Sequence, residues 1–198
     1  MEKGDRNKMN DFNKPADILI LSIGESNLHF YEFVRPISQF LHYNKIRHFV
    51  RNYKDLPKLD LSKVKKIIIA GTTLKNNKFI KNIDKFERLK DFNGPILGIC
   101  GGMQVLSLLY GGKLKKKQEI GFFKEKFNKD FLGMKGKKEV YHLHNNYATL
   151  PKDFNKYTAS KITQAIKHKE KPIYGVLFHP EVRNKELIEN FVNASFSK

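Results

Sequence analysis

The single cysteine of this chain lies in a segment that could expose a reactive thiol. Cys100 occurs in the run Gly98-Ile99-Cys100-Gly101-Gly102-Met103-Gln104, directly after the apolar residues Pro95-Ile96-Leu97. This pattern predicts a strand over 95–100, a sharp turn at Cys100 and a helix over 102–110. The N-terminus of a helix offers partial positive charge and free N–H groups, which favour a thiolate. We therefore interpret Cys100 as a nucleophile, although a lone cysteine is more often a buried structural residue.

A histidine suited to activate this thiol follows the β-type run Ile173-Tyr174-Gly175-Val176-Leu177-Phe178. His179 precedes Pro180, which favours an extended backbone at the histidine. Side chains two apart on an extended chain point to the same side, so Glu181 can hydrogen-bond the His179 ring and fix its tautomer. Cys100, His179 and Glu181 would then be the nucleophile, the general base and the orienting group of a covalent hydrolase.

Together these motifs resemble the class I glutamine amidotransferase family, which uses a Cys-His-Glu triad, and they look most like the glutaminase part of GMP synthetase. The resemblance extends from Asp17 to the C-terminal helix and includes Tyr110-Gly111-Gly112 and Glu119-Ile120-Gly121. It implies that Cys100 attacks the side-chain amide of L-glutamine, forms a γ-glutamyl thioester and releases ammonia. It also implies that Gln104 helps to hold the substrate.

The resemblance further implies that Gly71, Thr72 and Gly101 bind the oxyanion or the substrate. The loop Ala70-Gly71-Thr72-Thr73 stands where the family usually has Gly-Gly-Pro. A threonine resists positive φ, so we expect strain at Thr72. The loop would then need a partner or substrate to reach its productive shape, or the activity would be low.

The resemblance also implies a protein partner. The sequence ends soon after Glu181, and we expect no fused synthetase domain, so the ammonia would go to a separate ATP-dependent synthetase subunit. The chain has no G-x-x-x-x-G-K-[ST] motif and no Rossmann fingerprint. We therefore expect no cofactor in this chain and assign any ATP to the partner. Two alternatives stay open: a stand-alone γ-glutamyl hydrolase or peptidase of the same fold, and a catalytically weak regulatory homologue.

Two histidines alternate in the segment Glu139-Val140-Tyr141-His142-Leu143-His144-Asn145-Asn146 and would share one face of a strand. A His-x-His pair can bind metal. The sequence shows no further cysteine or carboxylate cluster at ligand spacing, and we expect no metal site. The resemblance places His144 near the active-site mouth or a synthetase interface, and an ordinary strand histidine is an equally weighted alternative.

The order of predicted elements indicates a single α/β domain of type-1 glutamine amidotransferase over residues 16–198, after a flexible polar leader over 1–15. The chain has 198 residues, of which 40% are hydrophobic, as expected for a globular domain with a substantial core. We expect a three-layer fold with a flavodoxin-like core, a mostly parallel sheet flanked by helices, and the active site at the carboxyl ends of its strands. Several short strands over 113–174 would form an antiparallel extension. The main expected strands are 18–23, 48–51, 66–70, 95–100 and 173–178, and the expected helices are 30–44, 79–92, 102–110 and 185–196.

The formal net charge of +18 and the pI of 9.8 are high. Lysines cluster only at 113–117 and 135–138, without the interleaved aromatic residues of RNA-binding modules. We favour a solvated basic surface over an acidic protein partner, and consider nucleic acid unlikely. No signal peptide and no apolar run of the ~18 residues needed for a membrane span is visible. With its lone cysteine, the chain is expected to be cytoplasmic, with no membrane partner.

Overall fold

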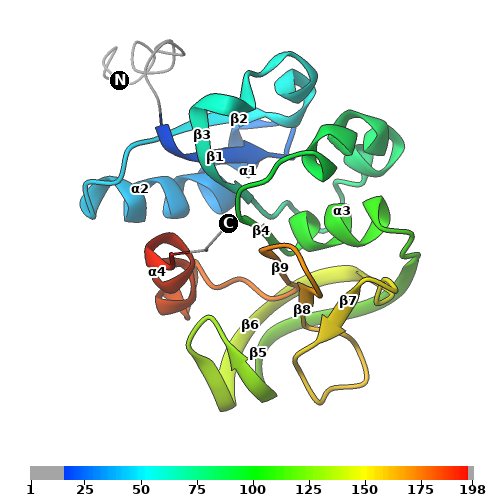
Figure 1. Ribbon diagram of the computed structural model, residues 1–198. Helices are drawn as coiled ribbons and strands as arrows, with labels where there is room; N and C mark the ends of the chain where they lie inside the picture. The colour runs from blue at the N-terminus through cyan, green and yellow to red at the C-terminus, as the bar shows by residue number, and fades with distance from the viewer. Residues whose placement is uncertain (1–15, 196–198) are drawn as a thin grey trace.

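A seven-stranded sheet organises the computed structural model, which describes residues 16–195 (Figure 1). The strand order is β2-β1-β3-β4-β9-β8-β7, in which the first five strands are parallel and the last two are antiparallel. The parallel part has the 2-1-3-4-5 order of flavodoxin-like folds. In sheet order the strands span His48–Asn52, Ala16–Ser22, Val64–Ile69, Ile96–Ile99, Ile173–Val176, Ala165–His168 and Phe154–Lys156. The predicted fold class is confirmed, while the expected leader over 1–15 lies outside the described residues.

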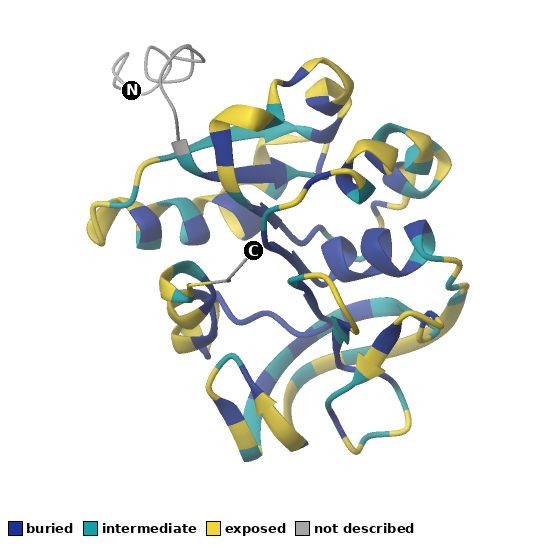
Figure 2. Ribbon diagram, in the orientation of Figure 1, coloured by how far each residue is buried: buried dark blue, intermediate teal, exposed yellow. Residues whose placement is uncertain are grey.

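Alternating apolar residues give the sheet a hydrophobic layer on each face. Ile18 and Ile20 of β1 belong to the cluster that includes residues of α2 and α4, whereas Leu19 and Leu21 belong to the cluster with α3, η3 and η5. Figure 2 shows the buried central strands, the partly exposed helices α2 and α4, and α3, which is almost entirely buried. Within residues 16–195, no helix is long and apolar enough to cross a bilayer. The helices are α1 (Asn27–His29), the π-helical η2 (Phe30–Val34), α2 (Arg35–Tyr43), the 3-10 helices η3 (Tyr53–Lys58), η4 (Leu61–Lys63) and η5 (Lys78–Lys90), α3 (Gly101–Leu109) and α4 (Lys185–Asn193).

Two predicted helices are present but are not regular α-helices throughout. The helix predicted over 30–44 is divided between η2 and α2, and Pro36, which has no N–H to donate, is the second residue of α2. The helix predicted over 79–92 is the 3-10 helix η5, with non-helical backbone at Asn82. Phe86 of η5 stacks on Tyr53 of η3 with ring centroids 5.2 Å apart. Contacts between distant segments therefore shape this region more than helix propensity does.

One long antiparallel hairpin takes up much of the region where several short strands were predicted. Its strands are β5 (Leu114–Phe131) and β6 (Met134–Ala148). Leu132 and Gly133 turn the chain with φ of 53° and 84°. Many of the lysines of β5 are exposed while Phe127 is buried against the core, so the charged residues do not interrupt the strand. The hairpin lies at the carboxyl end of the central sheet and covers the candidate site (Figure 1).

Candidate active site

Cys100 lies on a sharp turn between β4 and α3. Its backbone has φ 50° and ψ −106°, a conformation that costs energy for a residue with a side chain. The turn is held because small neighbours allow close packing: a Cβ on Gly102 would lie 2.3 Å from the carbonyl oxygen of Ile69 in β3. The N–H of Cys100 also donates to the carbonyl of Val176 at 2.7 Å. The predicted elbow is therefore present, with the thiol at the N-terminus of α3.

His179 and Glu181 form a buried pair after β9. Nδ1 of His179 lies 2.7 Å from Oε1 of Glu181, and the ring of Phe33 packs against the imidazole at a centroid distance of 5.3 Å. Burial lowers the pKa of His179, but the Glu181 carboxylate and the neighbouring Cys100 side chain raise it well above 6.5. Glu181 thus holds one ring nitrogen while the imidazole interacts with Cys100. The structure brings the three residues of the predicted triad together.

The predicted oxyanion residues meet beside the elbow. Gly101 is the first residue of α3, so its N–H has no partner within the helix, and a Cβ there would lie 3.2 Å from Cγ2 of Thr72. Neither Gly71 nor Thr72 has a positive φ, so the expected strain at Thr72 is wrong. Instead, Asn76 Nδ2 donates to Thr72 Oγ1 at 2.8 Å and to the Ile23 carbonyl at 3.0 Å. The loop is anchored in its present shape.

Gly71 is required not for its backbone angles but because it lies close to His179, the candidate general base. A Cβ at this position would lie 2.8 Å from Cε1 of His179 and 3.3 Å from Cδ1 of Phe33. Any larger residue would push the imidazole or the loop out of place. Gly71 therefore permits the loop to pack directly on the His179 ring.

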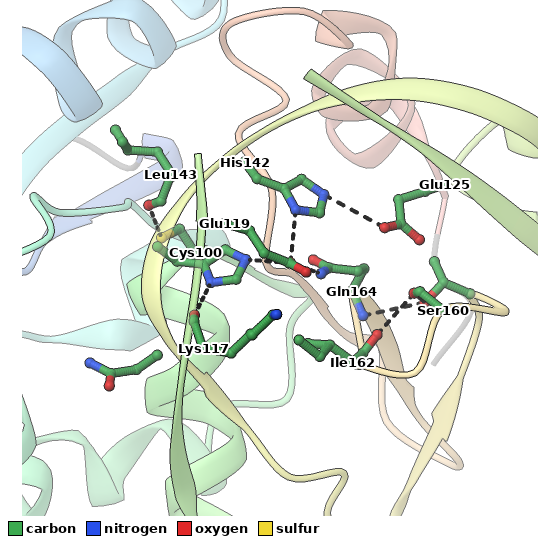
Figure 3. A network of polar contacts seen from close by, with 12 residues as sticks. Cys100, Lys117, Glu119, Glu125, His142, Leu143, Ser160, Ile162 and Gln164 are labelled. Carbon is green, nitrogen blue, oxygen red and sulfur yellow. Dashed lines mark hydrogen bonds and ion pairs between the residues drawn. The ribbon is translucent and has the colours of Figure 1, made fainter. Parts of the chain in front are cut away.

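The free edge of β6 covers the candidate nucleophile, a feature that the sequence did not predict (Figure 3). The Cys100 thiol donates to the Leu143 carbonyl at 3.6 Å, and the cysteine is 3% exposed. Beside it, the N–H of His179 donates to the Tyr141 carbonyl at 2.9 Å. Because these acceptors are backbone atoms, no residue type in the sequence marks them. In this structure β6 therefore shields the thiol from solvent.

Gln104 and His144 are both engaged with the hairpin. Gln104 Nε2 donates to the carbonyl of Asn146 at 2.8 Å. The side chain of His144 is buried behind β6, 3.1 Å from the Glu119 carboxylate, and is not at an open mouth. A cavity of about 480 Å³ borders this region. It is lined by Leu74, Asn77, Lys116, Lys117, Gln118, Asn145 and Asn146.

Comparisons with known proteins agree with this geometry. Residues 32–198 match the family model described as glutamine amidotransferase class-I. The chain is 32% identical over 176 residues to a glutamine-hydrolyzing GMP synthase subunit of Pyrococcus furiosus, covering 81% of this chain and 92% of that protein. It is 35% identical over 151 residues to the glutamine-hydrolyzing GMP synthase of Spiroplasma kunkelii, covering 69% of this chain but 29% of that protein.

Solved structures show the same fold. A putative GMP synthase subunit from Thermoplasma acidophilum has a TM-score of 0.77 at 22% identity, covering 89% of this chain and 92% of that one. A glutamine amidotransferase from Thermotoga maritima has a TM-score of 0.64 at 17% identity, covering 88% and 80%. At these identities the likeness concerns the fold alone. The family model, however, spans most of the sequence, and the chain therefore belongs to the class I glutamine amidotransferases, as its motifs predicted.

Proposed function

We propose that this chain hydrolyses L-glutamine to glutamate and ammonia and delivers the ammonia to a separate synthetase of the GMP synthase type. One observation carries the proposal: Cys100 lies on a strained elbow next to an imidazole whose Nδ1 is 2.7 Å from Glu181. The Pyrococcus furiosus relative is named as one subunit of its enzyme, and the match covers 92% of it, which supports a two-subunit enzyme. A cytoplasmic location, with its reducing conditions, would keep the catalytic thiol free.

The proposed reaction proceeds through a thioester. The Cys100 thiolate attacks the side-chain amide carbon of glutamine, and the C–N bond breaks as the imidazolium of His179 gives its proton to the leaving ammonia. His179 then takes a proton from water, which attacks the thioester and releases glutamate and the thiolate. The high pKa of His179 keeps the imidazolium available for the first step. In this proposal the N–H of Gly101 and the loop at Thr72 stabilise the oxyanion.

The closed position of β6 supports activation by the partner. The Leu143 carbonyl accepts a hydrogen bond from the Cys100 thiol, so glutamine must displace this contact before it can react. Next to it lies an exposed patch that we define as Ile120, Phe122 and Val182, each at least half exposed. Phe122 packs on Tyr141, whose carbonyl binds the N–H of His179. A synthetase that docks on this patch would therefore contact the strand that covers the thiol.

The test is glutamate release by the chain alone and with a synthetase of the GMP synthase type. We expect slow hydrolysis alone, a marked increase with the synthetase, and no hydrolysis by Cys100→Ser. Phe122→Asp should keep the basal rate and lose the increase, whereas Tyr43→Asp, at an exposed tyrosine on another surface, should respond like the parent. Equal activation of both variants would contradict the proposed docking surface.

The alternatives give different results. Rapid hydrolysis of γ-glutamyl peptides without any response to the synthetase would favour the stand-alone hydrolase. A diazo-ketone analogue of glutamine should label Cys100 in the presence of the synthetase. Failure to label it there would favour a regulatory homologue that does not form the thioester.

A further inference from the structure

The β5–β6 hairpin brings together a set of side chains outside the triad that has the composition of a metal site. The strand register pairs Glu119 with His144 and Gly121 with His142, so both imidazoles share a face with the carboxylate. Oε2 of Glu119 lies 3.0 Å from His142 Nδ1 and 3.1 Å from His144 Nε2. Glu119 thus supplies a carboxylate beside the His-x-His pair, which was not expected from the sequence (Figure 3).

The two histidines are buried, Glu119 is partly buried, and some polar atoms of the cluster lack hydrogen bonds. His142 and His144 are 0% and 1% exposed. His144 Nε2 is buried and forms no hydrogen bond, although it is aimed at Glu119. Oε1 of Gln164 is also buried without a partner, while Nε2 of the same amide lies 2.8 Å from Glu119 Oε2. Buried polar atoms of this kind are costly unless a ligand or water satisfies them.

We propose that the hairpin binds one divalent transition-metal ion of the Zn²⁺ class through Glu119, His142 and His144. In a tetrahedral zinc site with bonds of about 2.0–2.1 Å, neighbouring ligand atoms are about 3.3 Å apart. The two N···O separations of 3.0 and 3.1 Å are close to this value, and all three ligand atoms lie within 4.8 Å of one another. Rotating the Gln164 amide would place its oxygen beside Glu119 as a fourth ligand.

The surrounding residues hold both imidazoles in the way that metal-ligating histidines are usually held, through contacts of the second ring nitrogen. With Nε2 on the metal, the Nδ1–H of His144 would donate to the Lys117 carbonyl, 3.2 Å away. With Nδ1 on the metal, the Nε2–H of His142 faces Oε1 of Glu125 at 3.8 Å. These contacts select the nitrogen that each ring would present.

The site lies directly behind the strand that covers the nucleophile. Leu143, which accepts from the Cys100 thiol, is between the two proposed histidine ligands in the sequence. A bound ion would therefore fix the segment of β6 that closes the active site. The proposal does not depend on glutaminase activity, because the ligands do not include the triad.

The test uses the full chain with Cys100→Ser, which removes the thiol as a competing metal ligand. Zn²⁺ is titrated in competition with a chromophoric chelator, and Co²⁺ is added as a spectroscopic probe. We expect one ion per chain and the visible absorption of four-coordinate Co²⁺ without a thiolate charge-transfer band. A Co²⁺ spectrum typical of an octahedral, exposed site would contradict the proposal, as would the absence of Zn²⁺ binding at micromolar concentrations.

Variants then locate the ion. His144→Asn keeps a donor for the Lys117 carbonyl but removes the ligand, and Glu119→Gln keeps the size of the side chain. Each should weaken Zn²⁺ binding by at least about 100-fold. His168→Asn, at a buried histidine outside the cluster, should bind like the parent. Circular dichroism shows which variants are folded, and undiminished binding by a folded His144→Asn or Glu119→Gln would overturn the proposal.

Discussion

The packing of α3 on β3 predicts that Gly102→Ala destabilises the protein. The added Cβ would lie 2.3 Å from the Ile69 carbonyl oxygen and 2.9 Å from Ile69 Cβ. Strand β3 is hydrogen-bonded to β1 and β4 on its two edges and cannot retreat. The first turn of α3 must therefore move by about 1 Å to restore an ordinary van der Waals contact.

The expected loss in the free energy of unfolding follows from two opposing effects. Overpacking in a core costs about 1–3 kcal/mol, and the upper part of that range applies because both sides of the contact are backbone. Alanine recovers up to about 1 kcal/mol in helix propensity. The net loss is about 2 kcal/mol, and the melting temperature should fall by about 4–8 °C for a domain of this size.

Thermal unfolding followed by circular dichroism measures this change without any need for activity. Ser107→Ala is the matched control in the same helix, because the Ser107 hydroxyl is buried without a hydrogen bond. We expect this control to unfold at or slightly above the temperature of the wild type. A Gly102→Ala protein that melts within about 1 °C of the wild type would refute the close packing that positions Cys100.

The remaining predictions concern the base and a second histidine. In synthetase-activated assays, His179→Ala should lose nearly as much glutamine turnover as Cys100→Ala, and Glu181→Gln should lose less, because only orientation and charge change; the reverse order would contradict the assigned roles. Gly71→Ala should lower kcat about 10-fold or more with a smaller effect on KM, since its Cβ would lie 2.8 Å from the His179 ring; an unchanged kcat in the folded variant would disprove this contact. His168 Nδ1 accepts from two backbone N–H groups at 3.1 and 3.0 Å, and burial holds its pKa below 6.5. As the pH falls, His168 is therefore protonated in the unfolded chain before it is protonated in the folded chain. The free energy of unfolding then decreases below about pH 6.5. In His168→Asn, which keeps an acceptor, urea unfolding at pH 7 and pH 5 should show a smaller decrease; an identical decrease would exclude His168 as a contributor.

Local patterns in the sequence predicted the parts of the molecule that local chemistry controls. Continuous apolar runs predicted β1 and β3. Successive side chains of a strand face opposite sides of the sheet, so such a run supplies apolar residues to both faces. The glycines around Cys100 predicted the elbow, and the His179-Pro180-Glu181 segment predicted the hydrogen bond between Glu181 and the His179 ring. Each of these inferences needs only neighbours in the chain or a known family pattern.

Other features depend on contacts between segments far apart in the sequence. The 3-10 conformation of η5 accompanies packing against η3, and the anchoring of Thr72 depends on Asn76 and the end of β1. Neither residue composition nor periodicity encodes such contacts, so the 3-10 form of the helix predicted over 79–92 was not foreseen and the expected strain at Thr72 was wrong.

The sequence by itself determined the family, the sheet and the identity of the residues proposed as the triad. Only the tertiary structure decided how the site is covered and what lies behind the cover. The Leu143 carbonyl reaches Cys100 because β6 presents its free edge there, and Glu119 reaches His142 and His144 because of the register with β5. A carbonyl is common to every residue, and a register is set by pairing across a long hairpin, so neither is visible until the chain is folded.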